Sequence, residues 1–95
     1  MTQWRWDPRK DHANRRKHRL SFAFAARVFD DPLALSKIDE SSTEERWITM
    51  GMVEGVVILV VHTWQDRDAG EPEGRIISAR KATRHEREAY EESSS

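Results

Sequence analysis

The sequence has no cysteine, which excludes disulfide bridges, thiolate zinc sites and cysteine nucleophiles together. It also lacks a long apolar run. The longest, Val56 to Val61, is far shorter than the roughly 20 residues that a membrane-spanning helix needs. Residues 1–19 contain no apolar core of the kind found in signal peptides. We therefore expect a cytoplasmic protein without a membrane partner.

Several motifs that carry chemistry are also missing. The sequence contains no glycine-rich phosphate loop and no serine nucleophile elbow. Its histidines are His12, His18, His62 and His85, and no two of them lie three or four residues apart. The acidic stretch at residues 39–45 is typical of a solvated loop. We expect neither a metal site nor a cofactor.

The net charge is close to zero, but the charges are unevenly distributed. The 95 residues carry 16 Lys and Arg against 17 Asp and Glu, which gives a net charge of −1. Residues 1–19 have a net charge of +5 and residues 75–87 one of +4, whereas residues 30–74 have −8. If the fold brings the two basic segments together, they form a cationic surface suited to phosphate groups. Two ordinary solvated helices would produce the same pattern.

The first third of the chain predicts a short strand and two helices. The strand is expected from Gln3 to Trp6. Asp7 and Pro8 form a good helix start, and this helix should reach about His18. A second helix is expected from Ser21 to Phe29, before Asp30-Asp31-Pro32 ends it.

The rest of the chain predicts a small antiparallel sheet and a closing helix, so the fold class is α+β. The candidate strands are Leu33–Leu35, Glu45–Val53, Val56–Thr63 and Arg75–Arg80, with a hairpin turn at Glu54-Gly55 and a polar loop from Gln65 to Gly74. Thr83 and Glu86 form a capping box for a helix that reaches about Glu92. We expect one domain at residues 1–92 and a disordered tail at residues 93–95.

The side chains present are compatible with metal-free RNA cleavage. That reaction needs groups that move protons at the 2′-OH and the leaving 5′ oxygen, and cations that stabilise the crowded phosphate. His62 lies near the end of the most apolar strand, and Arg75 and Arg80 bracket the next one. A histidine at a strand end can equally be a hydrogen-bonded structural residue. The four tryptophans can stack on bases or fill the core.

Short motifs in a specific order run along nearly the whole chain. They are Trp6-Asp7-Pro8-x-Lys10, Asn14-x-x-Lys17-His18, Ser21-Phe22-x-x-Ala25-x-x-Val28-Phe29-x-Asp31-Pro32, Glu45-Arg46-x-Ile48-x-x-Gly51, and Arg75-Ile76-Ile77-Ser78-Ala79-Arg80-Lys81-Ala82-Thr83-x-x-Glu86-x-x-x-Tyr90. Together, from Trp6 to about Glu91, they resemble the BrnT toxin family.

The resemblance implies a ribonuclease toxin of a bacterial type II toxin–antitoxin module with a RelE-like fold, in which N-terminal helices and a C-terminal helix pack on the sheet. It implies a BrnA-like antitoxin as partner, two copies of each chain in a heterotetramer, and contact with DNA only through the antitoxin. Both basic segments would then line one RNA groove. The expected catalytic residues are His62, Lys17, Arg75 and Arg80, and the expected RNA-binding residues are His18, Lys81, Arg84 and Arg16.

Three features depart from the family pattern. Arg19 stands where the family usually has glycine, Ala23-Phe24 replace a pair that is often acidic, and the loop from Gln65 to Gly74 is longer than usual. The leading hypothesis is a metal-independent endoribonuclease that arrests growth when it is freed from its antitoxin. The alternative is a non-catalytic co-repressor subunit of the toxin–antitoxin complex.

Overall fold

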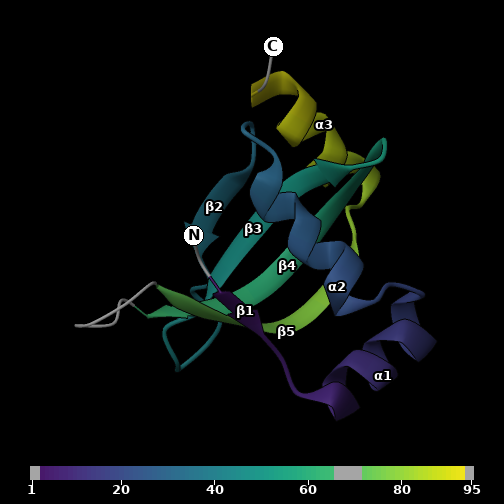
Figure 1. The fold of residues 1–95 in the computed structure, drawn as a ribbon. Coiled ribbons are helices and arrows are strands. Elements are labelled where there is room, and N and C mark those ends of the chain that lie inside the picture. Colours follow the sequence, from purple (N-terminus) through teal and green to yellow (C-terminus); the bar gives the residue numbers. More distant parts are fainter. Residues whose placement is uncertain (1–2, 66–71, 94–95) are drawn as a thin grey trace.

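The chain folds around a five-stranded sheet (Figure 1). The computed structural model describes residues 3–65 and 72–93. Its strands are β1 (Gln3–Arg5), β2 (Leu35–Ile38), β3 (Trp47–Val53), β4 (Val56–Gln65) and β5 (Glu73–Lys81), in the spatial order β1-β5-β4-β3-β2. With the helices described below, this confirms the α+β class.

The sheet is mixed, so the prediction of an antiparallel sheet is wrong for one strand. β2 to β5 pair antiparallel, whereas β1 pairs parallel to β5. A three-residue edge strand carries no direction signal of its own. Its place follows from packing instead, because the Trp4 ring stacks on Phe29 at 3.7 Å between centroids and lies against Gly74. Trp4 and Trp6 both pack against the core, whereas Trp64 is 40% exposed.

The helices begin where the sequence predicts. α1 (Pro8–His18) follows Asp7, whose side chain accepts a hydrogen bond from the Arg9 N–H at 2.8 Å. α2 (Phe22–Ala25) follows Ser21, whose hydroxyl accepts from the Phe24 N–H at 3.1 Å. The predicted second helix is only partly α-helical, because it continues as the 3-10 helix η1 (Ala26–Asp30).

Several predicted strand boundaries are shifted. Leu33 and Ala34 lie in a turn rather than a strand, since the Leu33 N–H donates to the Asp31 carboxylate at 2.9 Å. β3 starts two residues later than predicted, while β4 and β5 extend into both ends of the predicted loop. The middle of that loop, residues 66–71, lies outside the described residues. The predicted hairpin turn is confirmed, with positive φ values at Glu54 (48°) and Gly55 (81°).

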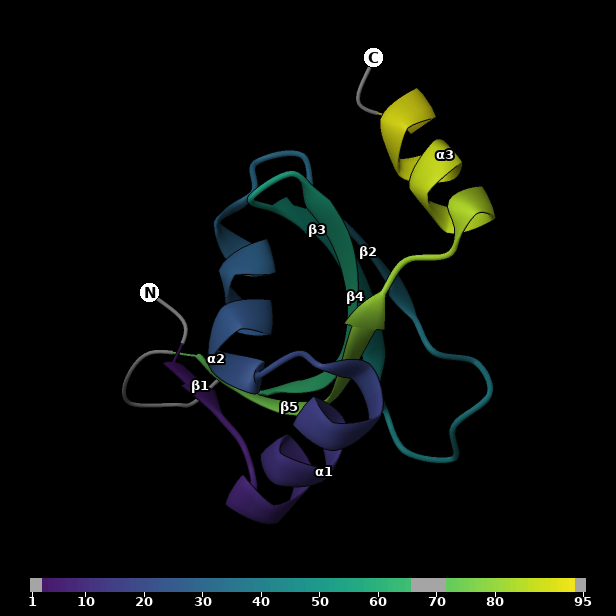
Figure 2. The ribbon, with the colours of Figure 1, turned by 90° about the vertical axis from the view of Figure 1, so that its right-hand side faces the viewer.

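The helices lie on both sides of the sheet (Figure 2). α1, α2 and η1 cover one face, where the largest fully buried side chains are Phe22, Ile58, Ile76, Val28 and Val60. Gly51 admits η1 closely, because a Cβ at this position would lie 2.9 Å from the Val28 carbonyl oxygen. No helix in the described ranges is long and apolar enough to cross a membrane.

α3 (Arg84–Ser93) lies beyond the other face and begins at the predicted capping box. Its Tyr90 is buried, and the Tyr90 hydroxyl donates a hydrogen bond to the Asp31 carboxylate. The helix includes Ser93, which the sequence assigns to the tail; residues 94–95 lie outside the described residues.

Candidate cationic site

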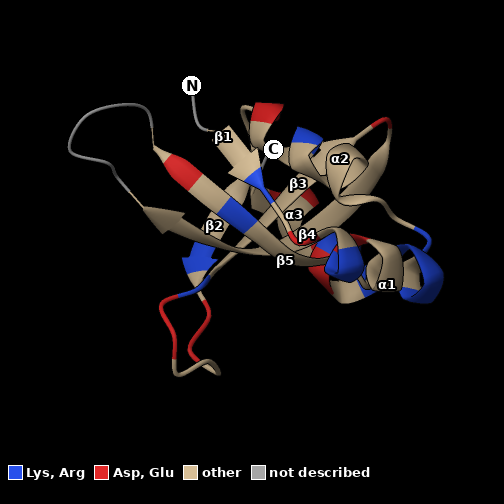
Figure 3. Ribbon diagram, turned by 60° about the horizontal axis from the view of Figure 1, so that its bottom comes forward, with Lys and Arg blue, Asp and Glu red and all other residues tan. Residues whose placement is uncertain are grey.

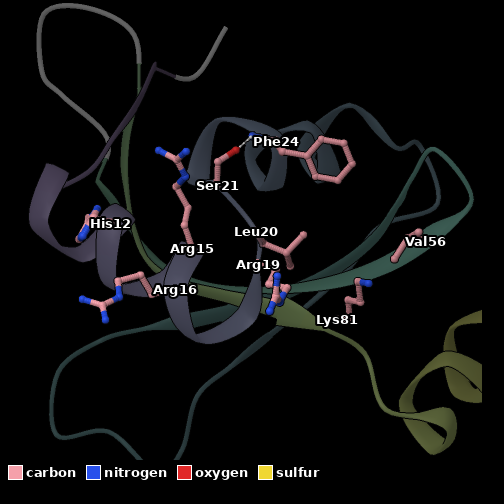
Figure 4. A pocket seen from close by; sticks show the side chains of 9 residues that line it. All are labelled: His12, Arg15, Arg16, Arg19, Leu20, Ser21, Phe24, Val56 and Lys81. Atoms are coloured by element: carbon pink, nitrogen blue, oxygen red, sulfur yellow. Dashed lines mark hydrogen bonds between the residues drawn. The ribbon is translucent and has the colours of Figure 1, made fainter.

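Lys and Arg residues gather on α1, at one end of the molecule (Figure 3). Where α1 ends, a cavity of about 770 Å³ lies between this helix, α2 and the ends of β4 and β5 (Figure 4). The lining residues come from both basic segments of the sequence. They are His12, Arg15, Arg16, Arg19, Leu20, Ser21, Phe24, Val56 and Lys81, and we call this cavity the cationic pocket.

The helical spacing of several residues directs their side chains into the pocket. Counted from His12, the pocket residues of this segment follow after three, four and seven positions, which places them on one side of a helix; they are Arg15, Arg16 and Arg19. Lys17, on the same helix, is exposed and does not line the pocket. The pocket side of α1 is therefore made of three guanidinium groups and an imidazole.

The side of α1 that faces the sheet is anchored by polar residues. Asn14 is 7% exposed; its amide donates to the Leu20 carbonyl at 3.0 Å and accepts from the Ala79 N–H at 3.1 Å. Asp11 accepts from the Phe22 N–H at 2.8 Å. These bonds tie α1 to the start of α2 and to β5. They hold in place a helix whose only aliphatic residue, Ala13, is exposed.

Arg19 ends α1 in a conformation that favours glycine. Its φ of 58° and ψ of 31° lie in the left-handed region, and its N–H donates to the Arg15 carbonyl at 2.9 Å. A residue with a side chain pays roughly 1–2 kcal/mol for this conformation. The backbone of Arg19, which lines the pocket, is therefore strained, because this residue has a side chain where glycine would be relaxed.

The pocket is positively charged, and its Arg and Lys side chains have no ion-pair partner in the described part of the chain. No carboxylate is among the lining residues. Within residues 3–65 and 72–93, the side chains of Arg15, Arg16, Arg19 and Lys81 form no ion pair. Four unpaired cations around one cavity make it a site for an anion.

Of the eight residues predicted for the site, two line this pocket. Arg16 and Lys81 reach it from α1 and the end of β5. His18 lies on α1, half-buried and outside the pocket lining. Arg84 pairs with Glu88 along α3 at 3.1 Å. The structure thus brings the two basic segments together, but through a different set of side chains from the predicted one.

His62 is a buried residue of the sheet. It is 4% exposed, and its ring contacts Trp4 and Phe29 edge to face at 5.1 and 4.9 Å. The Thr63 carbonyl, which only accepts, lies 3.3 Å from Nδ1, so Nδ1 carries the proton. Nε2 then accepts from the Thr49 hydroxyl at 2.7 Å. Burial lowers the pKa of His62, and the arrangement is that of the structural alternative, away from the cationic pocket.

Arg80 and Arg75 lie in other surroundings. Arg80 donates two hydrogen bonds to the Glu86 carboxylate, at 2.7 and 3.0 Å, and these bonds lower the pKa of Glu86 to about 2. Arg75 lines a separate cavity of about 520 Å³ together with carboxylates, among them Glu44 and Glu45. None of His62, Arg75 and Arg80 lines the cationic pocket, and the catalytic roles expected for them stay predictions.

Seven of the nine pocket residues were not predicted for the site, among them His12, Arg15, Arg19 and Phe24. The signal that could have found the first three is their helical spacing in a helix that is almost entirely polar. In the described part of the chain, no three His, Asp or Glu side chains are grouped so that they could hold a metal ion.

Comparison with known proteins gives one family. The family model of BrnT, the ribonuclease toxin of type II toxin–antitoxin systems, matches residues 6–86. No curated protein shows significant similarity to the chain.

Proposed function

Because the chain belongs to the BrnT family of ribonuclease toxins of type II toxin–antitoxin systems, we propose that it is an endoribonuclease whose RNA site is the cationic pocket. This family membership is the one that the sequence motifs indicate. We further propose that the fold is RelE-like, and that the chain cleaves cellular RNA in the cytoplasm and arrests growth when its antitoxin is absent.

The observation that carries the proposal is the set of unpaired cations in the pocket. Arg15, Arg16, Arg19 and Lys81 surround a cavity without a carboxylate, so that a phosphodiester is the natural occupant. Arginine and lysine also stabilise the extra negative charge of a pentacoordinate phosphate. The same residues can therefore bind RNA and favour its cleavage.

We propose metal-independent transesterification. The 2′ oxygen attacks the neighbouring phosphorus, the bond from phosphorus to the 5′ oxygen breaks, and the products are a 2′,3′-cyclic phosphate and a 5′-OH. One proton leaves the 2′-OH and one is delivered to the 5′ oxygen. His12 is the pocket residue whose side-chain type most often moves protons near neutral pH. The catalytic roles expected for His62, Lys17, Arg75 and Arg80 stay predictions, and their positions outside the pocket give them no support.

The test uses the purified chain and RNA in the presence of EDTA. We expect cleavage products that end in a cyclic phosphate and a 5′-OH. Lys81→Ala should cleave about tenfold more slowly or worse, whereas Lys10→Ala, which removes the same charge from α1 outside the pocket, should cleave like the wild type. RNA left intact at high protein concentration would instead favour the co-repressor alternative.

The type II family implies an antitoxin, and we propose that it is BrnA-like and forms a heterotetramer with two copies of each chain. The surface that best fits it is the free edge of the sheet. β2 is an edge strand whose neighbourhood exposes Leu33 (51%), Leu35 (39%) and Ile38 (53%). The adjoining loop carries Asp39, Glu40, Glu44 and Glu45, shown red in Figure 3, which would face the basic residues of a DNA-binding antitoxin.

A further inference from the structure

The cationic pocket has a second property beside its charge, which is an apolar wall. Leu20, Phe24 and Val56 line it together with Arg19 and Lys81. In the close view the Phe24 ring extends toward Val56, while Arg19 and Lys81 lie on the floor below Leu20 (Figure 4). A cavity with cations on one part of its wall and an aromatic ring on another offers separate places for a phosphate and a base.

The Phe24 ring is held in a defined position. Its residue is in the first turn of α2, where the Ser21 hydroxyl caps its N–H at 3.1 Å. The Arg27 guanidinium lies over the ring, with Cζ 5.4 Å from the centroid, and Arg27 is itself paired with Glu54 at 2.8 Å. A ring that is already ordered can take a stacked base without a further loss of side-chain freedom.

The backbone conformation of Arg19 indicates that the pocket is a binding site. The left-handed backbone at this position would be relaxed with glycine, and yet the residue there is an arginine that forms no ion pair with the described residues. Strain of this kind is found where a side chain has a task in binding. Arg19 lines the pocket, as Lys81 does, so the strained position carries a side chain that can bind a phosphate there.

From these observations we infer that the pocket takes an unpaired nucleotide of RNA, with its phosphate between Arg19 and Lys81 and its base against Phe24. The inference rests on the proposed function and names the substrate class of the same site. A base within a duplex is stacked between its neighbours and cannot present a face to Phe24. Unpaired bases can do so, and stacking on an aromatic ring is a common means by which proteins hold single strands. An acidic protein segment would satisfy Arg19 and Lys81 but would make no use of the ring.

The experiment measures binding of a fluorescent 2′-O-methyl oligonucleotide in EDTA, as a single strand and annealed to its complement. The modification removes the 2′-OH and so prevents cleavage by transesterification. The variants are Arg19→Gly and Phe24→Leu, with Lys10→Ala as a control that loses the same charge as Arg19→Gly from another side of α1. Phe24→Trp keeps an aromatic ring at the pocket wall.

We expect the single strand to bind at least tenfold more tightly than the duplex. Arg19→Gly should weaken single-strand binding about five- to tenfold and flatten its salt dependence by roughly one phosphate contact. The same variant should raise Tm by several degrees, because the left-handed strain is relieved. Phe24→Leu should weaken binding about tenfold, Phe24→Trp should bind more tightly than Phe24→Leu because it keeps an aromatic ring, and Lys10→Ala should bind like the wild type.

The outcomes separate the two proposals. If the wild type neither binds nor cleaves RNA, the proposed function fails. Two results would overturn the inference of an unpaired nucleotide while the ribonuclease function stands, provided that the wild type cleaves RNA. One is that the duplex binds as well as the single strand. The other is that both Arg19→Gly and Phe24→Leu bind like Lys10→Ala. Loss of antitoxin binding in Arg19→Gly with RNA binding intact would also overturn it, in favour of a protein segment as occupant.

Discussion

The chemistry open to His62 is decided by the side chains around it. From the sequence, a histidine near the end of a strand beside two arginines could move protons at a phosphate. In the fold its ring is enclosed by Trp4 and Phe29, and both nitrogens are occupied in a line of hydrogen bonds that runs through Thr49 to Ser36. Burial favours the neutral imidazole, in which Nδ1 donates to the Thr63 carbonyl and Nε2 accepts from the Thr49 hydroxyl.

The burial of His62 predicts a fall in stability with acid. The native pKa of His62 is lowered from its ordinary value of 6.5, so the unfolded chain takes up a proton that the native chain resists. The contribution of the neutral ring is complete above about pH 6.5, and it is lost progressively as the pH falls toward the lowered native pKa. Urea denaturation at pH 7.5, 6.5 and 5.5 should show a declining free energy of unfolding.

The control is His62→Gln, which keeps a polar side chain but removes the titration. This variant should be less stable than the wild type at pH 7.5 and should lose less stability between pH 7.5 and 5.5. Equal slopes in the two proteins would contradict the prediction. A loss of toxicity in His62→Ala would follow from a weakened fold, so any growth assay of this position needs a stability measurement beside it.

At the scale of elements, α3 depends on a few contacts with the rest of the molecule. It follows β5 directly and stands beyond the sheet face opposite α1 and α2. Among the described residues, α3 is joined to the rest of the molecule by the pair of Arg80 with Glu86 near its first turn and by that of Tyr90 with Asp31 in its last turns. Hydrogen bonding to Asp31 also raises the pKa of Tyr90 to about 12. The position of α3 is therefore set by polar pairs more than by an apolar face.

We predict that Glu86→Gln lowers the free energy of unfolding by about 1 kcal/mol at pH 7. The pair is bidentate, but the Arg80 side chain is 39% exposed, so solvent screening keeps the effect small. The pKa of Glu86 is lowered to about 2, so the stabilisation is present above its ordinary value of 4.5 and is lost as the pH falls from 4.5 toward 2. Urea denaturation at pH 7 and pH 3 measures both effects.

The matched control for this prediction is Glu88→Gln. Glu88 pairs with Arg84 one turn along the same helix, but the two side chains are 56% and 85% exposed. Its loss should change stability by less than about 0.5 kcal/mol. Similar losses in the two variants would show that the Arg80–Glu86 pair has no special role in holding α3.

Elements with local signals were predicted well from the sequence. Asp7 and Ser21 cap α1 and α2 through hydrogen bonds to residues two and three positions later, and the turn at Glu54-Gly55 lies within one hairpin. Each of these signals is complete within a few residues. The helix starts, the hairpin turn and the general α+β class follow from such signals.

Features that depend on distant partners were predicted poorly. β2 starts later than expected because Asp31 organises the preceding turn while it also accepts from Met52 and Tyr90. The pocket could not be predicted from the sequence, because its shape depends on how α1 is oriented against β5. That orientation is fixed by the hydrogen bond between Asn14 and Ala79, which are 65 residues apart. Arg16 and Lys81 were found from their charge, whereas Phe24 had no signal before the fold placed it.

At the scale of the whole molecule, the basic and acidic residues that sum to a net charge of −1 are concentrated at different ends. The Lys and Arg residues of α1 lie at one end, and the acidic loop between β2 and β3 lies at the other (Figure 3). The cationic pocket and the free edge of β2 are also separated by the sheet, because β4 and β3 lie between β5 and β2. An RNA site and an antitoxin surface placed there could be changed independently.

This separation predicts two variants with opposite defects. Ile38→Asp puts a charge at an apolar side chain that is 53% exposed, so the chain should fold, cleave RNA like the wild type and bind the antitoxin at least tenfold more weakly. Lys81→Ala should bind the antitoxin normally and cleave poorly. The assays are RNA cleavage by each purified variant, and growth on co-expression with the proposed BrnA-like antitoxin. Cells with Ile38→Asp should stay arrested, whereas cells with Lys81→Ala should grow even without the partner.

Two results would contradict docking of the antitoxin on the β2 edge. If the antitoxin neutralises Ile38→Asp as well as the wild type, it is seated away from that edge. If Lys81→Ala no longer binds the antitoxin, the antitoxin is seated over the pocket itself.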